Sequence, residues 1–433
     1  MPTRASHLTR AAAGLAVLAL VGCASDDPGT DDTSSSSTSS STPSSTSAED
    51  TTSATSSSAA TSSSAATSSP SSSSRSTTAT ADGPEASACV EQVRDAMTPT
   101  QQAGQLLMAA MQPGPATSLD GPIGAQGLGS MLYLGGWQES ATVAAASKHL
   151  QDVSPTVDGT KVGMLVAADQ EGGEVQQLTG SGFTSMPSGL EQAQDPDLRA
   201  SAKAWGAELK QAGVNVNLAP TADTVPSEIG TANEPIGKWG RQYGSTPQAA
   251  SKGAVAFGQG MQDAGVEPTV KHFPGLGRIT GNTDLRDTGI TDSTMTRDDA
   301  HLTPFADSIE AGTKIVMVGS AHYSKIDGET PALFSRTIVD GMLRDDLGFD
   351  GVVITDDVGA AKAVAATPVG ERATRFISAG GDIVLTAEPA QVPTMVSAIE
   401  AKAKGDAAFG KQVTASVTRV LTLKEDMGLL RCG

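Results

Sequence analysis

Eight short apolar runs constrain the fold of this chain more than any other feature of its 433-residue sequence. Each run is brief, often β-branched and apolar on both faces, as the buried strands of a parallel sheet are. Helix-like stretches separate the runs, and no hairpin signal lies between them. We therefore predict an α/β fold with strands at residues 106–111, 129–134, 165–168, 214–219, 268–270, 315–319, 352–354 and 383–385.

The stretches between the runs carry helix start and stop signals. Thr246 and Pro247 supply a capping side chain and a first-turn proline for a helix that Gly265 closes. Residues 198–212 and 392–404 are also predicted helices, each of which ends before a glycine. Repeated strand–helix units fit one (β/α)8 TIM barrel, for which ~250 residues is typical. A doubly wound open sheet is the alternative.

Reactive side chains at the strand ends favour the barrel. In a barrel the carboxyl ends of all strands converge on one mouth, whereas an open sheet spreads them along an edge. No G-x-G-x-x-G motif follows the early strands, which counts against a dinucleotide fold. The side chains concerned are Asp169, Asp223, Lys271, His272, His322, Asp356 and Asp357.

The N-terminal segment is not expected to belong to the barrel. A short apolar run follows two arginines and ends at Cys23, in a tetrad LVGC that resembles a bacterial lipoprotein box. It predicts a signal peptide at residues 1–22 and lipid on Cys23, with an ordinary signal peptide as the alternative. Residues 23–83 are rich in Ser and Thr and poor in large aliphatic side chains, which predicts a disordered tether. We therefore expect the domain at residues 84–433 to be lipid-anchored outside the cytoplasmic membrane.

Charge and cysteine content limit the partners and the redox state. The chain has 29 basic and 48 acidic residues, a formal net charge of −19, and no basic patch that would indicate a nucleic-acid partner. Cys89 and Cys432 remain once Cys23 is assigned to the anchor. In an exported protein they favour a disulfide that joins the two ends of the domain, and two free thiols are the alternative. We expect a monomer.

Two strand ends suit the chemistry of a hydroxyl-rich ligand. Asp356 follows GVVIT directly, so a rigid strand would aim its carboxylate into the mouth while Asp357 points elsewhere. The alternative is that both acids cap a helix at residues 358–365. Lys271 and His272 supply several hydrogen-bond donors at one fixed place. No metal site is expected there, because no second histidine lies at i+4 and no cysteine is available.

Three segments resemble the hallmark sequences of glycoside hydrolase family 3, and they look most like its single-domain β-N-acetylglucosaminidases. The resemblance extends, with gaps, over residues 103–424, and residues 315–335 look like the sixth-strand region of the family. The three segments are DQEGGEVQQL (169–178), KHFPG (271–275) and LRDDLGFDGVVITDD (343–357).

The resemblance implies a retaining mechanism on a β-linked sugar, with Asp356 as the nucleophile and no metal or organic cofactor. It also implies a set of residues that hold the hydroxyls of a terminal N-acetylglucosamine. They are Asp169, Arg241, Lys271 and His272, with His322 lining the same pocket.

The sequence departs from the family pattern on the loop after KHFPG. The family's acid/base is a histidine in an Asp-Ser-His triplet, and the matching triplet here is Asn282, Thr283 and Asp284. Either Asp284 takes over as the acid/base, or Asp287 does so through a shifted loop, or the loop has lost the acid. Glycines at four positions of this segment, including Gly281 and Gly289, suggest a mobile loop.

Glu174 and Gln177 also differ from the family, which usually has basic residues there, and this widens the choice of substrate. The leading hypothesis is an exo-β-N-acetylglucosaminidase that acts on muropeptides in cell-wall turnover or recycling. One alternative is a weakly active or non-catalytic sugar-binding lipoprotein. Another is a β-glucosidase or a phosphorylase that uses the same nucleophile.

Overall fold

The computed structural model describes residues 86–328 and 330–432. The predicted signal peptide at residues 1–22, Cys23 and the predicted tether at residues 23–83 lie outside the described residues. None of the helices in the described part of the chain is both long and apolar enough to cross a membrane.

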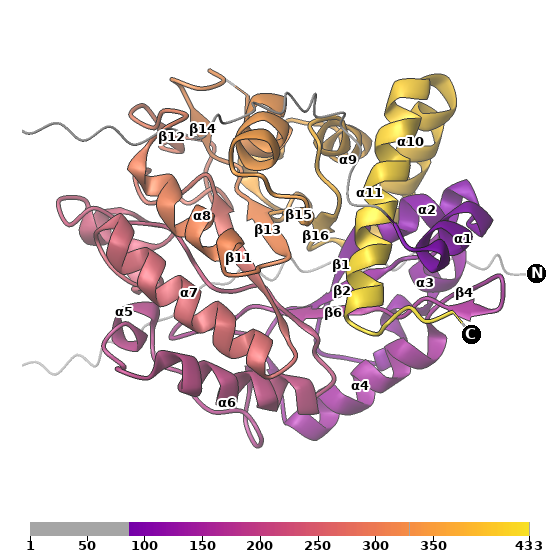
Figure 1. Cartoon of the computed structure of the whole chain (residues 1–433), viewed down its shortest axis with the longest axis horizontal. Coiled ribbons are helices and arrows are strands. Elements are labelled where there is room, and N and C mark those ends of the chain that lie inside the picture. Colours follow the sequence, from indigo (N-terminus) through magenta and orange to yellow (C-terminus); the bar gives the residue numbers. More distant parts are fainter. Residues whose placement is uncertain (1–85, 329, 433) are drawn as a thin grey trace, which may run out of the picture. The chain divides into compact units, whose positions relative to one another are not determined.

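Eight parallel strands form the centre of the fold, and each pairs with the next one along the chain. Figure 1 shows these strands enclosed by helices, with α4, α6 and α7 along the lower side of the view. The strands are β1 (Leu107–Met111), β2 (Ser130–Tyr133), β6 (Leu165–Ala168), β10 (Val216–Asn217), β11 (Glu267–Phe273), β13 (Ile315–Val318), β15 (Val352–Thr355) and β16 (Val384–Thr386).

The first and last strands close the sheet into a barrel. β1 pairs with β16 through Leu107 and Val384, and β15 reaches β16 through a parallel bridge between Ile354 and Ile383. The N–H of Thr355 donates to the carbonyl of Ile383 over 3.0 Å at the same junction. The predicted TIM barrel is therefore confirmed, and the alternative of an open sheet is wrong.

Strand lengths differ from the prediction where neighbouring side chains or loops take part in the pairing. β10 is shorter than residues 214–219 because the side-chain amides of Asn215 and Asn217 accept from backbone N–H groups of β6 and the loop after it. β11 is longer than residues 268–270 because the loop after β10 pairs with Lys271. Lys271 and His272 therefore lie within a strand rather than after it.

At least one helix follows each barrel strand within the described residues. In α7 the Thr246 hydroxyl accepts from the N–H of Ala249, and Gly265 ends the helix with a positive φ of 79°, as predicted. η6 is a π-helix. Eight of these helices, one after each strand, are α3 (Asp120–Gln126), α4 (Ser140–Val153), α6 (Leu198–Gln211), α7 (Pro247–Asp263), α8 (Thr303–Glu310), η6 (Thr337–Asp346), α9 (Val369–Ser378) and α10 (Val392–Gly405).

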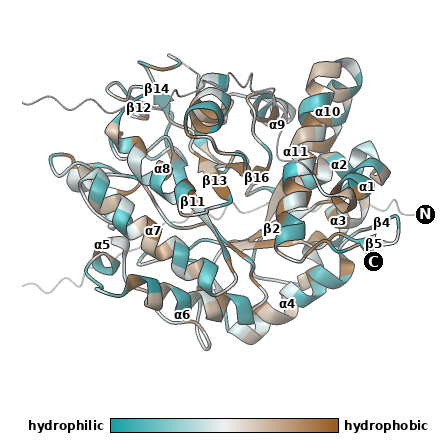
Figure 2. Ribbon diagram, viewed as in Figure 1, coloured by the Kyte–Doolittle hydropathy of each residue, from teal (hydrophilic) through white to brown (hydrophobic). Residues whose placement is uncertain are grey.

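The core lies inside the barrel and between the strands and the helices. Every residue of the eight strands is buried, as the two-sided apolar runs predicted. Figure 2 shows brown, hydrophobic strands at the centre and teal, hydrophilic patches on the helices around them.

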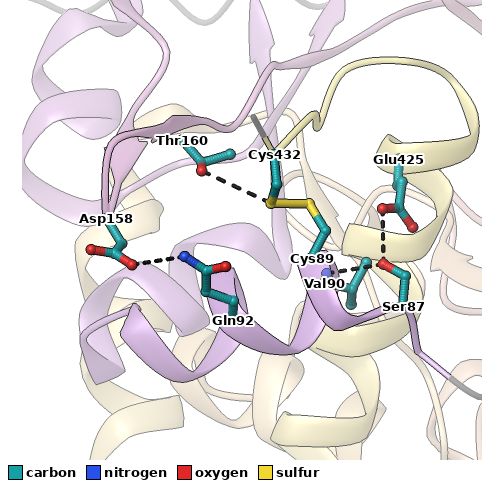
Figure 3. Close-up of a disulfide and its surroundings, with 8 residues drawn as sticks. All are labelled: Ser87, Cys89, Val90, Gln92, Asp158, Thr160, Glu425 and Cys432. Atoms are coloured by element: carbon teal, nitrogen blue, oxygen red, sulfur yellow. Dashed lines mark hydrogen bonds between the residues drawn. A yellow bond between two sulfur atoms is a disulfide. The ribbon is translucent and has the colours of Figure 1, made fainter.

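Both ends of the described chain meet beside the barrel. α1 (Ala88–Ala96) packs against α11 (Ala407–Asp426), and a disulfide joins Cys89 to Cys432 with their Cα atoms 5.7 Å apart. Figure 3 shows the Thr160 hydroxyl near Cys432, at an oxygen–sulfur distance of 4.0 Å. The same view shows Ser87, which caps α1 and also donates to Glu425 over 2.8 Å. The predicted disulfide is present.

Shorter helices and strands lie outside the eight barrel strands. α2 (Pro99–Gln105) precedes β1. Four pairs of short strands lie in the loops: β3 (Trp137–Gln138) with β9 (Leu178–Thr179), β4 (Thr156–Val157) with β5 (Thr160–Lys161), β7 (Gln170–Gly172) with β8 (Val175–Gln176), and β12 (Thr291–Asp292) with β14 (His322–Tyr323).

Candidate active site

A cluster of four charged side chains joins the carboxyl ends of β6 and β11 to the loop between β10 and α7. The ammonium group of Lys271 is 2.5 Å from Asp169 Oδ1 and 2.6 Å from Glu171 Oε1. Glu171 also binds Arg241 in a bidentate pair, with distances of 2.9 and 2.7 Å from Nε and Nη2. We call Asp169, Glu171, Arg241 and Lys271 the charged cluster. It brings together three of the predicted sugar-binding residues.

Burial and opposite charge compete in this cluster. Only 3% of the Lys271 side chain and 6% of the Glu171 side chain are exposed, and such burial disfavours both charges. The opposite charges prevail. Arg241 and Lys271 hold the pKa of Glu171 well below its usual range, and Asp169 and Glu171 raise the pKa of Lys271. Glu171, Arg241 and Lys271 therefore remain ionised at neutral pH and present fixed charged groups to a ligand.

His272 is oriented by a carboxylate from the neighbouring strand end. Its Nδ1 lies 2.8 Å from Asp223 Oδ2, and Asp223 Oδ1 accepts from the N–H of Leu276 over 2.6 Å. Asp223 is completely buried. This contact leaves Nε2 on the Arg241 side, where it is 3.5 Å from Nη2. A buried carboxylate on one ring nitrogen fixes the orientation of the imidazole and directs the other nitrogen to the ligand side.

Asp356 directly follows β15, and its N–H donates to the carbonyl of Val318 over 2.9 Å. Its half-buried carboxylate accepts from the N–H of Asp357 over 2.9 Å. Asp357 turns away and accepts from the N–H groups of Gly359, Ala360 and Ala387. Burial raises the pKa of Asp357, and these N–H donors act in the opposite direction. The two acids thus have different surroundings.

The alternative, in which both acids cap a helix at residues 358–365, is wrong. Only one 3₁₀ turn forms there, η7 (Lys362–Val364). The N–H groups of Lys362 and Ala363 donate to the carbonyls of Asp284 and Thr283, at 3.1 and 3.0 Å. Because these N–H groups bond to acceptors outside the segment, they cannot form the backbone hydrogen bonds of a regular helix. They also join the loop that carries Asp284 to the segment after Asp356.

The loop at residues 281–289, which we call the Asp284 loop, lies between β11 and β12. Its two ends meet where the N–H of Gly281 donates to the carbonyl of Gly289 over 2.8 Å. At its tip, the N–H of Asp284 donates to the Asn282 side chain over 2.8 Å. Thr283 is buried, with 2% of its surface exposed. The loop therefore has a defined conformation with Asp284 beside the mouth.

The surroundings of Asp284 favour its protonated form. Asp284 is exposed to solvent, although many protein groups surround its carboxyl group. This crowding, followed by the negative charges of Asp356 and Asp357, raises its pKa to about 7, while Arg241 acts in the opposite direction. A carboxyl group with such a pKa can exchange a proton near neutral pH, which is a requirement for a general acid/base.

Two other predicted residues lie further along the chain. Asp287 is on the exposed part of the Asp284 loop, and its side chain makes no hydrogen bond or ion pair within residues 86–328 and 330–432. His322 lies in β14, where it pairs with Thr291 of β12. The roles of both residues stay predictions.

The glycines of this segment allow close packing in the structure. A Cβ at Gly277 would lie 1.8 Å from the carbonyl oxygen of Thr224, and one at Gly281 would lie 2.4 Å from that of Thr288. Gly289 has a positive φ of 71°. Close contact and backbone conformation thus account for these three glycines, which the sequence analysis associated with loop mobility.

The sequence did not predict Glu171, and it placed Asp223 at the mouth without a role. Glu171 is the centre of the charged cluster, and Asp223 orients His272. One signal was available for each. Glu171 lies two positions after Asp169, and Asp223 ends a predicted strand region. No group of three or more metal-binding side chains is placed to hold a metal ion within the described residues.

Comparisons with known proteins agree with this geometry. The model of the glycosyl hydrolase family 3 N-terminal domain matches residues 100–423. A β-hexosaminidase from Xanthomonas axonopodis pv. citri (strain 306) is 30% identical over 290 residues, which cover 65% of this chain and 82% of the relative.

Solved structures give the same result. A β-N-acetylhexosaminidase from Beutenbergia cavernae DSM 12333 matches with a TM-score of 0.72 and 42% identity, over 76% of this chain and 99% of the other. A glycoside hydrolase family 3 β-N-acetylglucosaminidase from Paenibacillus sp. str. FPU-7 matches with a TM-score of 0.67 and 29% identity, over 77% of this chain and 63% of the other.

Proposed function

The chain belongs to glycosyl hydrolase family 3, and we propose that it is a retaining exo-β-N-acetylglucosaminidase that removes terminal β-linked N-acetylglucosamine. The names of its relatives support this substrate class. The observation that carries the proposal is the placement of Asp284, with a pKa raised to about 7, on a loop bonded to the segment after Asp356. Glycoside cleavage with retention needs such a pair of carboxyl groups.

In the proposed first step, the Asp356 carboxylate attacks the anomeric carbon of the terminal sugar. Asp284 donates its proton to the glycosidic oxygen, so the leaving group departs as a neutral alcohol. The bond between the sugar and the leaving group breaks as the bond to Asp356 forms. The product is a covalent glycosyl-enzyme, and Asp284 is left as a carboxylate.

In the proposed second step, the Asp284 carboxylate removes a proton from water, and the resulting nucleophile attacks the anomeric carbon. Asp356 is released, and Asp284 is protonated again. A carboxyl group with a pKa near 7 suits both steps, because it can lose and regain its proton near neutral pH. Two displacements at the same carbon return the sugar with its original β configuration.

The charged cluster supports recognition of the sugar. Lys271 and Arg241 offer N–H donors, and Asp169 offers acceptors, around a ring that carries both kinds of group. His272 adds a ring nitrogen whose direction Asp223 fixes. We propose that these side chains hold the hydroxyls of the terminal N-acetylglucosamine and that His322 lines the same pocket.

The charge of Asp284 also bears on the choice between hydrolysis and phosphorolysis. In the second step Asp284 is an anion, and it would repel a phosphate ion that approaches the glycosyl-enzyme. Water carries no charge, and it can donate a hydrogen bond to the same carboxylate. We therefore favour hydrolysis over phosphorolysis.

A covalent label tests the nucleophile and the activity together. A 5-fluoro N-acetylglucosaminyl fluoride forms the glycosyl-enzyme and releases it slowly, so the intermediate can be digested and sequenced by mass spectrometry. We expect the sugar on the peptide that contains Asp356. A label on another acid would reassign the nucleophile, and saturable sugar binding without label or product would favour the sugar-binding lipoprotein.

We propose that the enzyme acts on muropeptides at the cell envelope, attached through lipid on Cys23. The LVGC tetrad supports the anchor, and the disulfide between Cys89 and Cys432 supports an oxidising compartment. In cells that express the full chain, Cys23→Ala should prevent lipid attachment and reduce the membrane-bound fraction. An unchanged membrane fraction would contradict the anchor without affecting the enzymatic proposal.

A further inference from the structure

An ion pair reaches the Asp284 loop from outside the charged cluster. Arg286 lies two residues after Asp284, and its Nε and Nη2 donate to the two carboxylate oxygens of Glu234 over 2.9 and 2.8 Å. The same Glu234 carboxylate accepts a long bond, 3.4 Å, from the N–H of Asn282. Glu234 therefore contacts the loop on both sides of Asp284.

The opposite side of the loop is bonded to the segment after Asp356. The carbonyls of Thr283 and Asp284 accept from the N–H groups of Ala363 and Lys362. Asp284 thus lies between two attachments, one to Glu234 and one to the loop of the predicted nucleophile. The backbone bonds set the distance to Asp356, and the ion pair resists rotation of the loop away from it.

We infer that the pair Glu234–Arg286 is a latch that positions Asp284 for proton transfer. This inference rests on the proposed function, because it assumes that Asp284 exchanges a proton with the substrate. Glu234 and Arg286 are positioning residues, since neither is assigned a contact with the sugar or with the reacting atoms.

The exposure of Glu234 and Arg286 indicates that their pair contributes to positioning more than to stability. The Glu234 and Arg286 side chains are 30% and 55% exposed. Exposed ion pairs contribute little to the free energy of unfolding. A small displacement of a catalytic group, by contrast, lowers turnover by up to roughly 100-fold. The latch should therefore affect turnover much more than unfolding.

The molecule offers a closely matched control. Arg199 binds Asp263 through the same Nε and Nη2 atoms, over 2.8 and 2.9 Å, and these side chains are 51% and 33% exposed. This pair joins α6 to α7 on the outside of the barrel. Arg286→Gln and Arg199→Gln hence remove the same kind of ion pair at two places.

The test measures steady-state hydrolysis of chitobiose and hydrogen exchange of the loop amides in both variants. We expect Arg286→Gln and Glu234→Gln to lower kcat by roughly 10- to 100-fold with little change in KM. Exchange at Asp284 and Arg286 should become faster, and the thermal midpoint should stay within ~2 °C of wild type. Arg286→Lys, which keeps the charge but not the bidentate geometry, should fall between wild type and Arg286→Gln.

The results distinguish failure of the latch from failure of the proposed function. Wild-type kcat and wild-type exchange in Arg286→Gln would overturn the latch. An equal loss of kcat in Arg199→Gln would also overturn it, because the effect would then be a general one. A wild-type protein that does not hydrolyse the substrate would contradict the proposed function, while the exchange comparison would still report whether the pair holds the loop.

Discussion

The site contains two bidentate arginine–glutamate pairs in opposite settings. Glu171–Arg241 lies in the charged cluster, where the two side chains are 6% and 15% exposed. Glu234–Arg286 lies on the Asp284 loop, where the corresponding fractions are 30% and 55%. The chemistry of the two pairs is the same, and the difference is the surrounding protein.

This difference separates recognition from proton transfer. The buried pair joins β7, which follows β6, to the loop between β10 and α7, and Glu171 also binds Lys271 of the barrel strand β11. The exposed pair belongs to the Asp284 loop, and an ion pair as exposed as this one contributes little to the free energy of unfolding. We infer that the fold fixes the ligand-binding groups, whereas local contacts of the Asp284 loop set the geometry of the acid/base.

The largest effect is expected from Asp356→Asn, on the rigid side of this comparison. The substitution removes the proposed nucleophile but retains an oxygen that can accept from the N–H of Asp357. We expect kcat on p-nitrophenyl N-acetyl-β-glucosaminide to fall roughly 10⁵- to 10⁶-fold. The thermal midpoint should stay near that of wild type. Equal activity in the mutant and the wild type would refute the role of Asp356.

Asp284→Ala tests the loop that carries the exposed pair. Loss of a general acid/base costs about 10²- to 10⁴-fold in rate, and the loss should be greater for a sugar leaving group than for p-nitrophenolate. Azide should partly restore turnover, because it attacks the glycosyl-enzyme without needing a base, and the product should be the β-glycosyl azide.

Asp287→Ala is the matched variant for that experiment. Both acids lie on the Asp284 loop, and Asp284 lies near enough to Asp356 and Asp357 for their charges to raise its pKa. We expect Asp287→Ala to retain most of the activity. The reverse ranking of the two variants would transfer the acid/base role to Asp287.

The sequence predicted the barrel and its strand-borne side chains because both follow from local patterns. Buried β-branched runs predicted the strands, and their polar ends predicted the mouth. Glu171 was missed because its role depends on Arg241 and Lys271, which are distant in sequence and meet it only in the closed barrel. The latch was missed for the same reason, because nothing local marks Glu234 as the partner of Arg286.

The segment after Asp356 shows a further limit on predicting local structure from local sequence. Its composition allows a helix at residues 358–365, but Asp357 binds the N–H groups of Gly359 and Ala360. The N–H groups of Lys362 and Ala363 then bond to the Asp284 loop. A local helix signal therefore lost to contacts with a loop about 80 residues earlier in the chain.

Glu171→Gln and Glu234→Gln compare the buried pair directly with the exposed pair. Removing one partner from a buried ion pair leaves an uncompensated charge, which costs about 3–5 kcal/mol. The same substitution in an exposed pair costs about 0–1 kcal/mol. Denaturant unfolding should therefore show a large loss of stability for Glu171→Gln and almost none for Glu234→Gln. Similar losses in the two variants would remove the distinction between the buried pair and the exposed pair.

The smallest expected effect is the pH dependence of kcat/KM, which Asp284 on the loop should set. Asp284 works as an acid in its protonated form, and its pKa of about 7 exceeds the ordinary value of 3.8. The active form therefore predominates below pH 7 and is lost above it. On chitobiose, kcat/KM should fall about tenfold for each pH unit above 7, and this fall should be absent from the residual rate of Asp284→Asn. If the same alkaline fall persisted in Asp284→Asn, a different group would control it, and the charges around the mouth would no longer account for the acid/base.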